Sequence, residues 1–79
     1  MVKDSDIKEH MEVLGSDGKH VGKVDHMEGS DRIKLTKNDP QAAGHHHFIA
    51  LAAVARVEGN KVHLNKPSQA VFLEWQSAA

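Results

Sequence analysis

Residues 13–24 read Val-Leu-Gly-Ser-Asp-Gly-Lys-His-Val-Gly-Lys-Val, and this stretch decides the fold that the sequence predicts. It contains an Asp that can cap its own turn, followed by a Gly that tolerates a positive φ, which is the chemistry of a tight hairpin loop. Strands are therefore expected on both sides, over residues 12–14 and 19–28. Asp17 and Gly18 are interpreted as structural residues of the turn.

The second of these strands carries Gly22 between Val21 and Val24, two valines that are three residues apart. This spacing breaks the two-residue alternation of a strand, and an isolated Gly at such a point indicates a β-bulge. Gly22 is therefore also interpreted as structural, as a residue that helps the strand to bend around a barrel.

Residues 32–37 alternate between polar and apolar side chains, which predicts a strand with Ile33 and Leu35 facing inward. The remaining apolar segments predict further strands of similar length, over residues 45–49, 55–58 and 61–64. These strands are separated by turns rather than by crossover helices, so the pattern favours antiparallel pairing.

A helix is expected at the C-terminal end of the sequence. Pro67 fits the first helical position, and the helix would continue over about residues 68–76. Its Val71, Phe72 and Trp75 share one apolar stripe. The predicted fold is mostly β: a small barrel of five to six short antiparallel strands with a short C-terminal helix. It forms a single domain over residues 1–79, with an ordered core at about 7–76.

The hairpin at residues 13–24 resembles the opening of PRC-barrel domains, which begin with a strand, an Asp-Gly turn and a second strand carrying a Gly before its inward Val. Three later stretches, at residues 33–37, 46–49 and 62–66, look like a bacterial family of unknown function grouped with the PRC-barrel-like folds. The resemblance covers about residues 7–75. It implies a six-stranded, barrel-like domain that serves assembly or interaction, and it supplies no catalytic motif.

Charge and composition exclude several functions. Ten basic and eleven acidic residues give a formal net charge of −1, which argues against nucleic-acid binding because such proteins usually carry a basic face. The sequence has no apolar run long enough for a membrane span and no signal-peptide pattern, so we expect a cytoplasmic protein without a membrane contact. Cysteine and tyrosine are absent, as are nucleophile and phosphate-loop motifs, and we expect no enzymatic activity.

Histidine is unusually frequent, with seven residues, three of them consecutive. In a strand, His45 and His47 share one face, and His63 or His26 from another strand could complete a three-nitrogen site for zinc, nickel or copper. His46 and Phe48 share the other face and are expected to close one end of the core. The alternative for all of these histidines is structural, with exposed rings or a ring that donates to a backbone carbonyl.

A protein of this size without disulfides has a small core, and such proteins are often stabilised by a partner. The stripe of Val71, Phe72 and Trp75 either packs on the open end of the barrel or contacts a second copy, and an uncovered sheet edge offers another contact. We expect a homodimer and an unidentified protein partner. Two functions stay open: a non-catalytic interaction module, and a histidine-based binder of a transition metal or small ligand.

Overall fold

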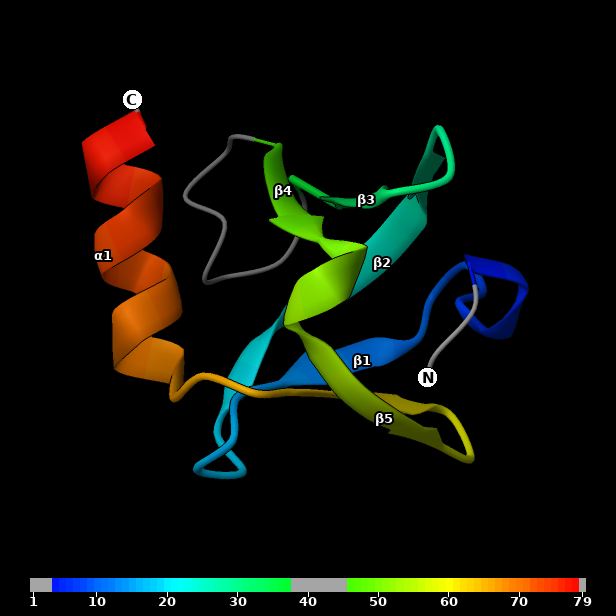
Figure 1. Cartoon of the computed structure of the whole chain (residues 1–79), viewed down its shortest axis with the longest axis horizontal. Coiled ribbons are helices and arrows are strands. Elements are labelled where there is room, and N and C mark those ends of the chain that lie inside the picture. Colours follow the sequence, from blue (N-terminus) through cyan, green and yellow to red (C-terminus); the bar gives the residue numbers. More distant parts are fainter. Residues whose placement is uncertain (1–3, 38–45, 79) are drawn as a thin grey trace.

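The computed structural model describes residues 4–37 and 46–78. In sequence order the elements are η1 (Asp4–Asp6), β1 (Glu12–Leu14), β2 (His20–Glu28), β3 (Arg32–Leu35), β4 (His47–Ala50), η3 (Leu51–Ala53), β5 (Val54–Glu58), β6 (Lys61–Leu64) and α1 (Ser68–Ala78). Figure 1 shows short strands that curve around a common interior, with α1 set to one side of them. The elements follow the predicted order of strands with one terminal helix.

Within the described residues, the six strands form one sheet in the order β4-β3-β2-β1-β6-β5. The strands β4 and β5 lie at the two ends of this order, and no pairing in the described part of the protein joins them. The sheet is therefore not closed into a barrel by hydrogen bonds. The prediction of a mostly β fold with one C-terminal helix is confirmed, whereas the closed barrel is not.

One strand pairing contradicts the prediction that all strands are antiparallel. Strands β1 and β6 run parallel, with Val13 opposite Val62. The other pairings join strands that are consecutive in the sequence, and these are antiparallel. The prediction was wrong for β1 and β6 because a hairpin turn imposes an antiparallel sense only on the strands it connects.

Strand β2 bends at an irregularity next to Gly22. The register of β1 against β2 shifts at this point, so that Val21 is an extra residue in β2. Because of this shift, both Val21 and Val24 face the core, with exposed fractions of 0% and 1%. A Cβ atom on Gly22 would lie 3.2 Å from Cδ1 of Leu35, so the glycine also leaves room for that core residue.

The core is built from the inward faces of the sheet. Ile33 and Leu35 are 0% and 1% exposed, as the alternation of their strand predicts. The largest fully buried side chains all come from the central strands of the sheet: Ile33, Leu35, Leu64, Val13, Val21, Val24 and Val62. A core of aliphatic side chains from both halves of the sequence therefore holds the two ends of the fold together.

Helix α1 contributes Val71 to this core, at 3% exposed. It begins at Ser68, one residue after the Pro67 that was expected to be its first residue, and continues to Ala78. None of the helices in the described part of the protein has the length and apolar character that crossing a bilayer requires.

Candidate functional site

The outer edge of β4 presents backbone groups that β3 does not use. Strand β4 pairs antiparallel with β3, and beyond the end of the strand the N–H of Leu51 donates to the carbonyl oxygen of Asp31 at 2.8 Å in the same register. In such a ladder, residues that exchange backbone hydrogen bonds with the opposite strand alternate with residues that do not. Because Leu51 makes such a bond, Ile49 is also hydrogen-bonded to β3, whereas Phe48 and Ala50 are not. The N–H and C=O groups of Phe48 and Ala50 therefore point away from β3, toward the outside of the sheet.

Phe48 places an aromatic ring on the outer surface of this edge. The residue is 42% exposed, and the Arg32 guanidinium carbon lies 5.2 Å from the ring centroid. A cation–π contact at an exposed site contributes about 0.5–1 kcal/mol, so it orients the ring without covering it. The expectation that Phe48 closes one end of the core with His46 is wrong. Ile49, at 5% exposed, faces the core instead, and alternation along the strand turns Phe48 outward.

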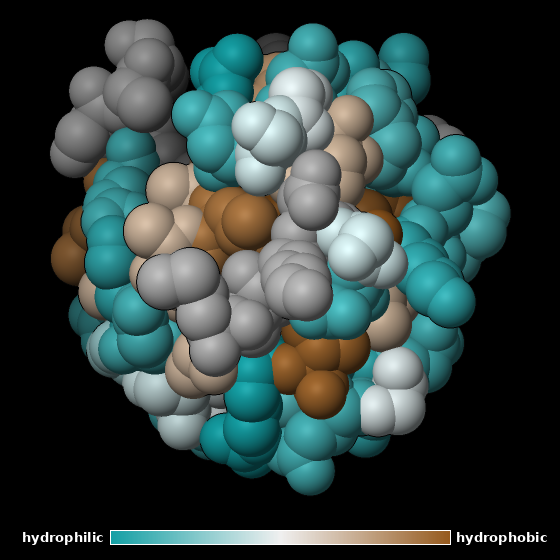
Figure 2. Space-filling view, turned by 45° about the vertical axis from the view of Figure 1, so that its right-hand side comes forward, coloured by the Kyte–Doolittle hydropathy of each residue, from teal (hydrophilic) through white to brown (hydrophobic). Residues whose placement is uncertain are grey.

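Leu73 of α1 is a second large apolar residue on the surface, at 55% exposed. It lies two residues after the core residue Val71, which places it on roughly the opposite side of the helix. On the face drawn in Figure 2, most of the surface is hydrophilic and the apolar surface is confined to separate patches. Large apolar side chains that remain exposed against such a background are candidates for contact with another molecule.

A cavity of about 170 Å³ lies between β4 and α1. The side chain of Lys66 forms an ion pair with Glu74 on the helix side of this cavity. The residues that line it come from both elements and from the segments beside them: Phe48, Ile49, Ala50, Ala53, Lys66, Val71 and Glu74. Among the described residues, this cavity separates β4 from α1.

The structure describes the side chains of two of the three predicted interface residues, and these two differ in burial. Val71 belongs to the core, and Phe72 is half-buried and packs against it. The side chain of Trp75 lies outside the described part of the structure. An interface formed by these three residues stays a prediction. The sequence analysis did not identify Phe48 and Leu73 as exposed residues. For Leu73 the signal was its two-residue spacing from Val71 in the helix.

The residues of the predicted metal site are only partly described. His45 lies outside the described residues, and His47 and His63 are half-buried on β4 and β6. Three other strands separate β4 from β6 in the sheet order. Residues 4–37 and 46–78 contain no group of three or more His, Asp or Glu side chains placed to hold a metal ion. Because His45 is not described, the zinc or nickel site stays a prediction, which calorimetric titration of the chelator-treated protein can test.

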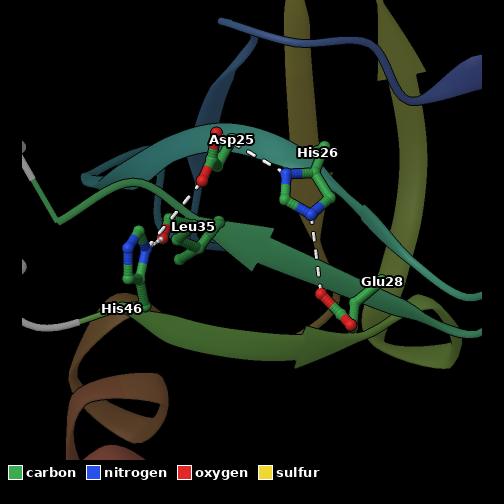
Figure 3. A network of polar contacts seen from close by, with 5 residues as sticks. All are labelled: Asp25, His26, Glu28, Leu35 and His46. Carbon is green, nitrogen blue, oxygen red and sulfur yellow. Dashed lines mark hydrogen bonds and ion pairs between the residues drawn. The ribbon is translucent and has the colours of Figure 1, made fainter.

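Two histidines take part in a polar network on the outer surface of the sheet (Figure 3). Nδ1 of His46 donates to the backbone carbonyl oxygen of Leu35 at 3.0 Å and lies 3.9 Å from the Asp25 carboxylate. The ring of His26 lies 3.6 Å from Asp25 and 3.5 Å from Glu28. Partly exposed pairs of this kind contribute little stability. His46 thus makes the backbone contact expected of a structural histidine.

The turn at Asp17 connects the first hairpin to the C-terminal helix. Gly18 has a φ of +80°, which few residues other than Gly adopt without strain. The Asp17 carboxylate accepts a hydrogen bond from the N–H of Lys19 at 3.3 Å. It also accepts hydrogen bonds from the N–H and the hydroxyl of Ser68, at 3.2 and 2.9 Å. Asp17 therefore caps α1 from a turn that is 51 residues away in the sequence.

These contacts shift the ionisation of Asp17. Desolvation raises the pKa of its carboxyl, but the hydrogen bonds from Ser68 and Lys19 together outweigh it and leave the pKa below its ordinary value. Gly15 allows the close approach, because a Cβ atom there would lie 2.4 Å from the backbone nitrogen of Ser68. The geometry assigns Gly15, Asp17 and Gly18 to holding the fold together.

The opposite edge of the sheet, β5, carries charged side chains. Arg56 donates to the Glu58 carboxylate, and this hydrogen bond and the charge of Arg56 lower the pKa of Glu58. His63, whose Nε2 lies 3.6 Å away, adds a smaller effect in the same direction. Charged side chains on an edge strand oppose pairing with another molecule. Strand β4 reads His-Phe-Ile-Ala and has no Asp, Glu, Lys or Arg.

The protein is thus a small mostly β domain with an open six-stranded sheet and a terminal helix. Residues 7–72 match the family described as an uncharacterized protein conserved in bacteria, DUF2171. This match spans every strand from β1 to β6 and the start of α1, so the chain belongs to that family. The prediction of a bacterial family of unknown function is confirmed. No curated protein matches the sequence.

Proposed function

We propose that this domain is a non-catalytic interaction module that associates with a second copy of itself through the surface around β4. The observation that carries the proposal is the 42% exposed Phe48, which stands on the outer edge of the sheet beside a cavity of about 170 Å³. An assembly role also agrees with the resemblance of the sequence to PRC-barrel domains.

The physical argument begins with size. A protein of 79 residues without cysteine has no disulfide to stabilise its small core. Burial of apolar surface contributes about 25 cal/mol per Å², so covering exposed aromatic and aliphatic side chains at a contact between copies favours association. The contact also satisfies backbone groups at a sheet edge.

The two edges of the sheet differ in how well they are protected from association. Strand β5 carries Arg56 and Glu58, whose side chains are 61% and 60% exposed, whereas β4 carries no residue of either charged type. Charged edge residues would have to lose hydration when a second molecule approaches, which opposes pairing. Self-association is therefore favoured at β4 over β5.

The absence of catalysis is part of the proposal. The sequence offers no cysteine or tyrosine, and its serines lie in turns, at helix ends or in the tail. Among the described serines, Ser68 is buried and its hydroxyl donates to Asp17, so it is held by a structural contact. The cavity at β4 is bordered by apolar side chains and one Lys–Glu ion pair, which offers a contact surface rather than an acid–base pair with a nucleophile.

The test compares the association of three forms of the full-length protein by size-exclusion chromatography with light scattering. The wild type is expected to change from monomer toward dimer as its concentration rises, and Phe48→Ser is expected to remain monomeric at concentrations where the wild type is dimeric. Lys23→Ser, which removes a large exposed side chain from the interior strand β2, is the matched control and should behave like the wild type. Equal association of all three forms contradicts the role of the β4 surface.

A further inference from the structure

The β4 edge has the geometry to pair with the same edge of a second copy. We infer that two copies join β4 to β4 in an antiparallel register around a two-fold axis at Ile49, so that one sheet continues across both molecules. This inference rests on the proposed function and adds its geometry: which backbone groups bond, and which side chains meet. The occupant of the edge is a second copy of this protein.

The hydrogen-bonding pattern supports a single register. Phe48 and Ala50 are the residues of β4 whose backbone groups point outward. Around a two-fold axis at Ile49, Phe48 of one copy lies opposite Ala50 of the other. This register places both outward-pointing residues of each strand in bonded pairs, so every outward N–H and C=O of β4 finds a partner. If the two-fold axis lay one residue away in either direction, Phe48 or Ala50 would be paired with a residue outside β4.

The side chains are complementary in the same register. Phe48 and Ala50 alternate with the core residue Ile49, so both lie on the outer face of the sheet. The large ring of one copy then lies beside the small Ala50 of the other, where no bulky side chain opposes it. Arg32 pairs with Ala50 across β3 and β4, so its guanidinium lies beside the incoming ring as well as beside its own Phe48. Pairs of large and small side chains across strands allow close packing.

Charge does not oppose a second copy at this edge. The segment from His46 to Ala53 has no Asp, Glu, Lys or Arg, so two copies bring no permanent like charges together. In the proposed register His47 lies opposite Leu51 rather than opposite its own counterpart. The net charge of −1 gives only a small repulsion between whole molecules.

The expected affinity follows from the area available. A stable interface buries about 800 Å² on each partner, which is roughly a sixth of the 4912 Å² of accessible surface of this protein. Strand β4 has four residues, so its pairing buries less than that. We therefore expect a weak dimer that forms at micromolar or higher concentrations, in which single hydrogen bonds and single side chains have measurable effects.

Ala50→Pro tests the hydrogen bonds without disturbing the fold. Ala50 already has a φ of −66° and a ψ of 139°, which a proline ring accepts. Its N–H points outward, so the substitution removes no bond to β3, and the preceding Ile49 is in a strand, as a residue before proline prefers. Ala50→Ser keeps the N–H and a small side chain and serves as the control.

We expect Ala50→Pro to weaken dimerisation at least about tenfold, because two symmetry-related hydrogen bonds are lost. Ala50→Ser should associate like the wild type, and urea unfolding of the monomeric forms should show that Ala50→Pro remains folded. Amide hydrogen exchange provides a second measurement. The amides of Phe48 and Ala50 should exchange rapidly in the wild-type monomer and become protected as the dimer forms.

The outcomes separate the geometry from the proposed function. If Ala50→Pro dimerises like the wild type while Phe48→Ser does not, the β4 surface mediates association but the strand pairing is wrong. Unchanged exchange of the Phe48 and Ala50 amides in the dimer overturns the pairing in the same way. If the wild type itself remains monomeric at all concentrations, the proposed function and the inference both fail.

Discussion

At the scale of single residues, the contact between Asp17 and Ser68 joins the two ends of the fold. The sequence predicted the turn at Asp17 and Gly18, because the residues that define a turn are adjacent. It did not predict Ser68 as a partner, because a contact between residues 51 positions apart depends on β6 returning alongside β1. The close approach of Gly15 to Ser68 was missed for the same reason.

The lowered pKa of Asp17 predicts a specific dependence of stability on pH. Because the folded pKa lies below the ordinary value of 3.8, the ionised carboxylate stabilises the fold above that pH. This stability is lost as the pH falls through the folded pKa. In urea unfolding, the free energy of unfolding of Asp17→Asn should therefore be lower than that of the wild type at neutral pH, with the difference shrinking in acid. Asp31→Asn, in another turn, is the control. A difference that stays constant with pH contradicts this role.

Gly15 is predicted to tolerate no side chain. In Gly15→Ala the new Cβ atom would lie 2.4 Å from the Ser68 nitrogen, so the hairpin and the start of α1 must separate. We expect a loss of about 1–3 kcal/mol in the free energy of unfolding, as for other overpacked sites. Gly59→Asn is the matched control, since Gly59 has open space around it and Asn tolerates its φ of +54°. Equal stability of the two variants would show that the approach of Gly15 to Ser68 is unimportant.

At the scale of elements, local periodicity predicted strands better than it predicted their faces and partners. The alternation around Ile33 and Leu35 was sufficient to predict which side of the strand faces the core, because the neighbouring residues are polar. The histidine-rich segment before Phe48 gave no such contrast, so the face of Phe48 was assigned incorrectly. The parallel pairing of β1 and β6 left no local signal at all, because no turn connects them and their register is set by the shared core.

The core position of β3 gives a prediction of its own. Ile33 is fully buried on β3, which pairs with β2 and β4, so Ile33→Ala should lower the free energy of unfolding by about 2–5 kcal/mol, and Ile33→Val by about 0.5–1.5 kcal/mol. For a domain of this size the larger loss approaches the whole stability. Chemical denaturation followed by circular dichroism measures both. Lys34→Ala, on the other face of the same strand, is the control, and an Ile33→Ala variant as stable as Lys34→Ala contradicts the assigned core.

At the scale of the whole molecule, the sequence indicated a small β domain that benefits from a partner, but not where the sheet is open. A strand has the same alternating sequence pattern in a closed barrel and in an open sheet. The difference between them depends on whether the two end strands of the sheet pair with each other. Here β4 and β5 stay unpaired with each other within the described residues. The edge position of β4 follows from that opening, and only the three-dimensional arrangement shows that an edge without charged residues borders a cavity.

Sedimentation equilibrium of the wild-type protein, over concentrations from micromolar to millimolar, tests the central claim most directly. The account predicts that the average mass rises reversibly from that of one molecule toward that of two and stops there, because β4 is used up in a two-fold contact. A mass that stays at that of one molecule over the whole range, or that grows without limit, would contradict it.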